Sequence, residues 1–78
     1  MDIQEFIKKI EAEFDDLKPG SLQPDSEFKE MLNWNSINSV VLSAMIEFEY
    51  HVLLTSDDFK KVFSIRDLAD YIERKRSE

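Results

Sequence analysis

Residues 35–50 of this chain read NSINSVVLSAMIEFEY, and this segment decides the fold. Its apolar side chains fall at helical spacing on more than one face, which predicts a helix over residues 36–50. One stripe consists of Leu42, Met45, Ile46 and Tyr50, and the other of Ile37, Val40, Val41, Ala44 and Phe48. Because a small domain can hardly bury a helix on all sides, we expect part of the second stripe to contact other proteins.

Ser36 stands where the preceding loop becomes this helix. Free backbone N–H groups and the positive end of the helix dipole meet at such a position, so a phosphate on the serine hydroxyl is electrostatically favoured. The alternative interpretation is that Asn35 or Ser36 is simply the N-cap, because both residue types cap helices well. Ser39 and Ser43 fall inside the helix and are interpreted as ordinary helix residues.

The region before this helix predicts another helix followed by a long loop. The first helix face consists of Ile3, Phe6, Ile7, Ile10, Phe14 and Leu17. Pro19-Gly20 is expected to end this helix, since proline cannot continue it and glycine accepts a left-handed cap. Residues 18–35 then form a loop that its own apolar side chains must hold in place. The candidates are Leu22, Phe28, Met31 and Leu32, and Asp25-Ser26-Glu27 is expected to start a short turn of helix.

Two further helices are predicted after residue 50. Thr55 or Ser56 with Asp57-Asp58 gives a capped, acidic start for a short third helix. The apolar residues of this helix are Phe59, Val62 and Phe63. Ser64-Ile65-Arg66-Asp67 resembles a capping box, which starts a fourth helix. Its buried stripe is Ile65, Leu68, Ala69 and Ile72, and its basic end is Arg74-Lys75-Arg76.

The predicted fold is therefore all-α, with four helices, a long first loop and a short third helix. Its common core is expected to consist of Phe6, Ile10, Leu42, Ile46, Leu68 and Ile72. The chain has 78 residues and no cysteine, so we expect one domain over residues 1–78, stabilised by helix packing rather than by disulfides or thiolate metal sites.

The 17 acidic and 10 basic residues give a net charge of −7. This charge repels nucleic acid and anionic membranes and favours basic protein partners. No apolar run approaches membrane-spanning length, and the N-terminal residues are acidic where a signal peptide is basic. We expect a soluble, cytoplasmic protein that neither spans a membrane nor binds nucleic acid.

The chain contains few groups suited to catalysis. Its single histidine, His51, follows the helix that Ser36 opens, so about fifteen residues of helix separate them by roughly 22 Å, too far for proton transfer. The carboxylate pairs Asp15-Asp16 and Asp57-Asp58 are interpreted as solvated or helix-capping groups. There is no glycine-rich phosphate loop, and no cluster of histidine or cysteine for a metal. We therefore expect a protein that is not an enzyme.

Residues 36–50, together with the long loop before them and the order of four helices, closely resemble the modification segment of acyl carrier proteins. In that family a serine that follows Asp and precedes Leu opens the second helix and carries 4′-phosphopantetheine. The resemblance implies a four-helix carrier bundle in which Ser36 receives this group from coenzyme A through a phosphopantetheinyl transferase. Trp34 before the motif also resembles some D-alanyl and peptidyl carriers; it is expected to anchor the loop on the core, or alternatively to face visiting enzymes.

The chain departs from the family at Asn35, where an amide replaces the aspartate that is thought to help the transferase hold its metal and substrate. We expect this change to slow modification, to require a dedicated transferase, or to prevent modification altogether. Asn38, Val41 and Phe48 stand where family members often have carboxylates, so partner recognition is expected to depend more on apolar contact than on charge.

The leading hypothesis is a monomeric carrier that shuttles acyl groups as thioesters between synthase or acyl-transferring enzymes. Its expected partner contacts are Asn35, Ile37, Val40, Val41, Ala44 and Phe48. The cargo stays open, because fatty acyl, polyketide, aminoacyl or peptidyl, and D-alanyl carriers share the motif. The alternative hypothesis is an unmodified helical interaction module that keeps the carrier fold and binds a partner through the apolar face of the same helix.

Overall fold

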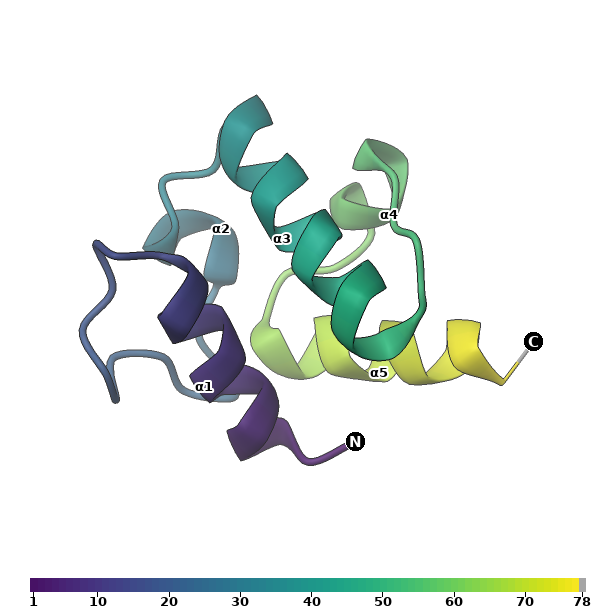
Figure 1. The fold of residues 1–78 in the computed structure, drawn as a ribbon, viewed down its shortest axis with the longest axis horizontal. Coiled ribbons are helices and arrows are strands. Elements are labelled where there is room, and N and C mark those ends of the chain that lie inside the picture. Colours follow the sequence, from purple (N-terminus) through teal and green to yellow (C-terminus); the bar gives the residue numbers. More distant parts are fainter. Residues whose placement is uncertain (78) are drawn as a thin grey trace.

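The computed structural model describes residues 1–77, and it folds them into five helices. These are α1 (Ile3–Glu13), α2 (Phe28–Met31), α3 (Ser36–Tyr50), α4 (Ser56–Lys60) and α5 (Ile65–Arg76). Helix α1 packs against both α3 and α5, and the short α2 and α4 flank α3 in the view of Figure 1. The prediction of an all-α fold is confirmed, with the short turn expected in the first loop appearing as α2. Within residues 1–77, no helix is long and apolar enough to cross a membrane.

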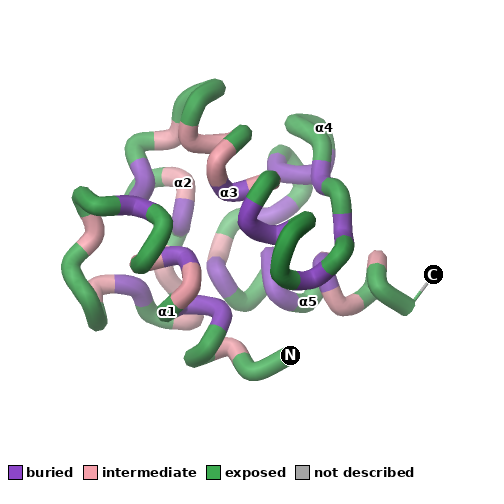
Figure 2. Tube along the Cα trace, in the orientation of Figure 1, coloured by how far each residue is buried: buried purple, intermediate pink, exposed green. Residues whose placement is uncertain are grey.

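The predicted core is confirmed. Six side chains from the three long helices are fully excluded from solvent, namely Phe6, Ile10, Leu42, Ile46, Leu68 and Ile72. Figure 2 shows buried stretches along α1, α3 and α5, while the N-terminal end of α3 is largely exposed. The bounds of α3 agree with the prediction, and its buried residues are those of the first stripe.

Helix α1 ends earlier than predicted. The Asp2 carboxylate caps its start by accepting from the backbone N–H groups of Gln4 and Glu5, at 3.0 and 3.3 Å. The helix stops at Glu13, however, and Phe14 is extended while its side chain stays in the core. The expectation that the helix runs to Pro19-Gly20 was wrong. Two aspartates follow Phe14, and negative charge at a helix C-terminus opposes the dipole, so the chain leaves the helix there.

The long first loop is held by hydrogen bonds to a side chain of α1 as well as by its own apolar side chains. The Glu11 carboxylate accepts from the N–H groups of Gly20 and Leu22, at 3.0 and 3.1 Å. Leu22, Phe28 and Leu32 are buried as predicted. Met31 was expected to join them and is exposed instead, because the single turn of α2 directs Phe28 and Leu32 inward and leaves Met31 on its outer side.

The two C-terminal helices begin as predicted, each with a capping box. Helix α4 ends at Lys60, so Val62 and Phe63 lie beyond the helix that was expected to include them; Val62 is buried and Phe63 is 60% exposed. Asp58 is buried rather than exposed. Its carboxylate accepts hydrogen bonds from the Thr55 backbone N–H and from the Tyr71 hydroxyl on α5. Of the two interpretations of Asp58, helix capping is confirmed, because Asp58 completes the capping box with Thr55, and solvation is wrong.

Candidate functional site

Ser36 is the first residue of α3, and its side chain is exposed. The cap of this helix is Asn35, whose Oδ1 accepts from the Asn38 N–H at 2.8 Å. Ser36 is thus not needed as the cap, and within residues 1–77 no hydrogen bond engages its Oγ. The first N–H groups of a helix have no partner inside it, so those of Ser36 and Ile37 stay available beside this hydroxyl. The arrangement can accommodate an anionic group on the serine.

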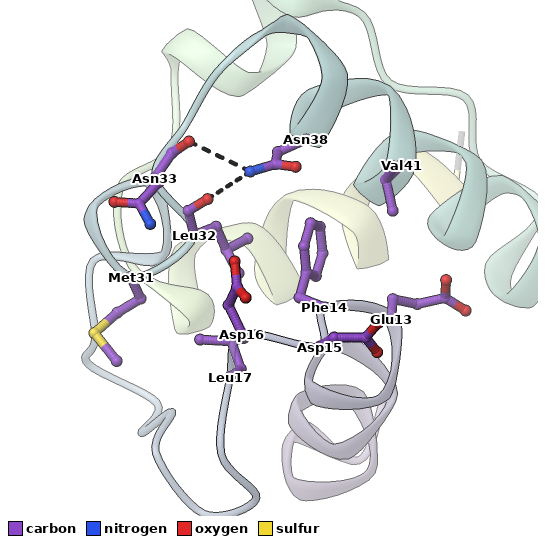
Figure 3. Close-up of a pocket in the computed structure, with 10 residues that line it drawn as sticks. All are labelled: Glu13, Phe14, Asp15, Asp16, Leu17, Met31, Leu32, Asn33, Asn38 and Val41. Atoms are coloured by element: carbon purple, nitrogen blue, oxygen red, sulfur yellow. Dashed lines mark hydrogen bonds between the residues drawn. The ribbon is translucent and has the colours of Figure 1, made fainter.

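The loop that leads into Ser36 is fastened by amide side chains. The Asn38 Nδ2 donates to the carbonyl oxygens of Leu32 at 2.7 Å and of Asn33 at 3.3 Å, as Figure 3 shows. The Asn35 Nδ2 also donates to the Asn33 carbonyl, at 3.2 Å. Asn33 has φ of +50°, a left-handed conformation that asparagine tolerates better than most residues. These bonds fix the direction in which the chain enters α3.

Trp34 anchors the same loop on the core, as expected. Its ring makes edge-to-face contacts with Phe28 and Phe59, with centroids 5.4 and 5.0 Å apart. Such aromatic pairs stabilise by about 0.5–1.5 kcal/mol beyond the area that they bury. The indole is only half-buried, however, and it also forms part of the surface beside Ser36. The two interpretations of Trp34 are therefore compatible.

Ser36 borders a hollow of about 380 Å³ between α2, α3 and α4. Eight residues line it: Lys29, Trp34, Asn35, Ser36, Ser39, Ser56, Phe59 and Lys60. A second hollow of about 340 Å³ shares Ser39, Ser56 and Phe59 with the first and reaches Leu53 at the far end of α3. Together they provide a surface groove that starts at the Ser36 hydroxyl.

The position of α4, which forms one wall of this groove, depends on the buried Asp58. Its carboxylate accepts from the backbone N–H of Thr55 at 2.8 Å, from the Thr55 hydroxyl at 3.1 Å, and from the Tyr71 hydroxyl. Lys75 on α5 adds an ammonium group at 3.9 Å. The Thr55 N–H contributes most, followed by the Tyr71 hydroxyl, to a pKa of Asp58 below its ordinary value. The ionised carboxylate thus joins α4 to α5.

The second stripe of α3 is exposed except at Val41, which packs partly against the core. Ile37, Val40 and Phe48 are 73%, 66% and 80% exposed, Ala44 is exposed and Val41 is half-buried. Their spacing of three and four residues places these five side chains on one face. With Asn35 at its upper end, this stripe brings together all the residues that the sequence predicted for partner contact. Contiguous exposed apolar side chains of this kind are typical of protein-binding surfaces.

A third hollow, of about 300 Å³, lies beside this stripe at the end of α1 and was not predicted from the sequence (Figure 3). Its lining includes the carboxylates of Glu13, Asp15 and Asp16, and it borders Val41 of the stripe. The premature end of α1 brings these acids close to α3. The adjacent Asp15 and Asp16, in the last turn before the predicted helix end, were the available signal, but their position beside Val41 depends on the tertiary fold.

Neither nucleophilic catalysis nor metal binding is supported by the geometry. Ser36 begins α3 and His51 caps its other end, so the two side chains lie at opposite ends of one helix. In the part of the chain that the structure describes, no three side chains of His, Cys, Asp or Glu group as a metal site. What the site presents is an accessible hydroxyl, a helix N-terminus, a groove and an apolar face.

Comparison with known proteins extends these observations. The model of the family described as the phosphopantetheine attachment site matches residues 3–72. An acyl carrier protein from Thermosynechococcus vestitus is 31% identical over 74 residues, which cover 95% of this chain and 91% of the relative. An acyl carrier protein from Nitratidesulfovibrio vulgaris (strain DP4) is 28% identical over 76 residues, which cover 97% of this chain and all of the relative.

Proposed function

Since the chain belongs to the acyl carrier protein family, whose cofactor is 4′-phosphopantetheine, we propose that Ser36 is the attachment site of this group. The observation that carries the proposal is the position of Ser36: its exposed Oγ lies at the N-terminus of α3, beside an open groove, and Asn35 performs the capping. Ser39 is less suitable because its hydroxyl donates to the Ser36 carbonyl at 2.9 Å. Ser43 likewise donates to the Leu54 carbonyl at 2.9 Å.

In the proposed reaction, the Ser36 Oγ attacks the phosphorus that carries the pantetheine arm in coenzyme A. A new phosphodiester bond forms, the pyrophosphate bond breaks, and adenosine 3′,5′-bisphosphate leaves. The serine proton passes to a base of the transferase, because among residues 1–77 neither a histidine nor a carboxylate lines the hollow beside Ser36. When bound, the arm supplies a terminal thiol that carries an acyl group as a thioester. The chain's own part is to hold the hydroxyl outward and to stabilise negative charge at the helix N-terminus.

Helix α3 also provides the surface that partner enzymes would bind. Its exposed apolar stripe begins beside Ser36 at Ile37 and continues to Phe48. An enzyme that covers this stripe has the attachment serine at the edge of its footprint. The proposed partners are a phosphopantetheinyl transferase and the synthase or acyl-transferring enzymes of one biosynthetic pathway, and the protein itself is a carrier rather than a catalyst.

The proposal is tested by incubating the protein with coenzyme A, Mg²⁺ and a broad-specificity transferase, followed by intact-mass measurement. We expect the mass to increase by one phosphopantetheinyl group. Ser36→Ala should abolish the increase, whereas Ser39→Ala and Ser56→Ala should retain it. The latter two are matched controls because both serines line the same hollow as Ser36. An unchanged wild-type mass, alongside full modification of a known carrier, would contradict the proposal.

One observation favours the alternative function, an unmodified interaction module. Asn35 replaces the family's aspartate, and its amide is engaged by Asn38 and Asn33 in holding the loop. In a module of this kind, the apolar stripe alone would bind the partner. Ser36→Ala would then leave partner binding unchanged, and the wild-type protein would stay unmodified even with a transferase from its own cells.

A further inference from the structure

We propose that Lys29 and Lys60 bind the phosphodiester that joins 4′-phosphopantetheine to Ser36, and that they hold the start of the arm in the hollow between α2, α3 and α4. This inference rests on the proposed attachment at Ser36. The two lysines would position the arm, and both the shape and the charge of the hollow support this role.

The charge of the hollow differs from that of the whole protein. Acidic residues outnumber basic ones by 17 to 10 along the chain, yet the charged side chains that line this hollow are Lys29 and Lys60. Lys29 belongs to α2 and Lys60 is the last residue of α4, so the fold brings them to one cavity from two separate helices. The Ser36 hydroxyl and the N-terminus of α3 form another side of it. A phosphodiester placed on Ser36 would face positive groups from three helices.

Both ammonium groups keep donors available for an anion. Lys60 forms an ion pair with Asp57 at 3.6 Å, but the two side chains are 77% and 82% exposed, and such surface pairs contribute little. Lys29 lies over the Phe63 ring at 5.4 Å from its centroid, and among residues 1–77 no carboxylate is within ion-pair distance of it. A lysine ammonium has three donors, so neither contact prevents it from binding a phosphate oxygen.

The backbone positions of the two lysines are fixed by buried neighbours. Phe28, which precedes Lys29, is fully buried, and Phe59, which precedes Lys60, is 2% exposed. The Trp34 ring contacts both phenylalanines and so joins α2, α4 and the loop that enters α3. The flexible lysine stems therefore start from fixed points on either side of Ser36. Charge-assisted hydrogen bonds from lysine to phosphate are among the stronger polar contacts in proteins.

The test uses the modified protein, with Lys29→Gln, Lys60→Gln and the double variant compared by ³¹P NMR relaxation of the phosphodiester. Lys61→Gln is the matched control, because it removes the same charge from the neighbouring position but lines a different hollow with Asp67, Asp70 and Glu73. We expect the phosphorus of the wild type and of Lys61→Gln to relax as a partly immobilised group. It should become more mobile in each single variant and most mobile in the double variant.

Each exposed lysine–phosphate contact is expected to raise the ratio of held to free arm by up to about fivefold, and added salt should weaken the contact. Raising the ionic strength to about 1 M shortens the Debye length to roughly 3 Å, so the wild-type relaxation should approach that of the double variant. Equal relaxation in the wild type and the double variant at low salt, with full loading on Ser36 verified by mass, would overturn the inference. Absence of loading on Ser36 would instead overturn the proposed attachment, so the two failures are distinguishable.

Discussion

Truncation of Ile46 to alanine should strongly destabilise the domain. Ile46 is fully buried on the inward face of α3, the helix that packs against α1. The change removes three carbon atoms, and at about 0.8 kcal/mol per buried methylene the lost transfer free energy is roughly 2.4 kcal/mol. The cavity left behind adds to this, so we expect a total loss of about 3–4 kcal/mol in the free energy of unfolding. A domain of 78 residues has roughly 4–12 kcal/mol in total, so the loss is a large part of it.

Ile37→Ala on the same helix is the matched control. It makes the same chemical change at a side chain that is 73% exposed, and its effect should stay within about 0.5 kcal/mol. Urea titration followed by the fluorescence of Trp34, the single tryptophan, measures both variants. With a urea dependence near 1 kcal/mol/M, the Ile46 variant should unfold at roughly 3 M less urea than the wild type. A loss below about 1 kcal/mol, or equal losses in both variants, would refute the assignment of the buried face.

Three further outcomes are expected. Asp58→Asn should lower the free energy of unfolding at pH 7, and its deficit should shrink as the pH falls, because hydrogen bonds, the largest from the Thr55 N–H, depress the pKa of Asp58 in the folded state. The stability from the ionised carboxylate is thus present above the unfolded-state pKa of about 3.9 and is lost as the pH falls through the lower folded-state pKa; urea titrations from pH 7 to pH 3 measure this, and a deficit that stays constant over this range would contradict the role of the ionised Asp58. Phe48→Glu should weaken binding to the transferase about tenfold in calorimetric titration while leaving the unfolding midpoint unchanged, since this side chain is 80% exposed; unaltered affinity would exclude it from the interface. Asn35→Asp should speed modification in a time course of intact mass, because it restores a carboxylate for the transferase and keeps the capping oxygen; equal rates would show that the charge is unimportant here.

Helix identity and the core followed from the sequence because both depend on local patterns. The apolar spacing of α3 and the capping asparagine before it determine where this helix begins and which face is buried. The end of α1 did not follow, because Phe14 remains in the core with an extended backbone, and side-chain spacing does not distinguish that conformation from a helix. Asp58 was misjudged for a related reason: its partner Tyr71 belongs to another helix, and only the tertiary fold brings them together.

The candidate site was likewise predictable in part. Ser36 and the exposed stripe lie on one helix, so the sequence alone could place them relative to each other. The groove beside Ser36 was not predictable, because Lys29 and Lys60 come from α2 and α4 and meet only through the packing of aromatic side chains around Trp34. The acidic hollow at the end of α1 also depends on tertiary packing.

Peptide mapping by tandem mass spectrometry of the protein purified from its own cells tests most directly whether Ser36 carries 4′-phosphopantetheine. We expect the peptide containing Ser36 to bear the phosphopantetheinyl group on this serine, with or without an acyl group on the thiol. An unmodified Ser36, in an extract where another carrier protein is found modified, would contradict the proposed attachment. So would the same group found on a different residue.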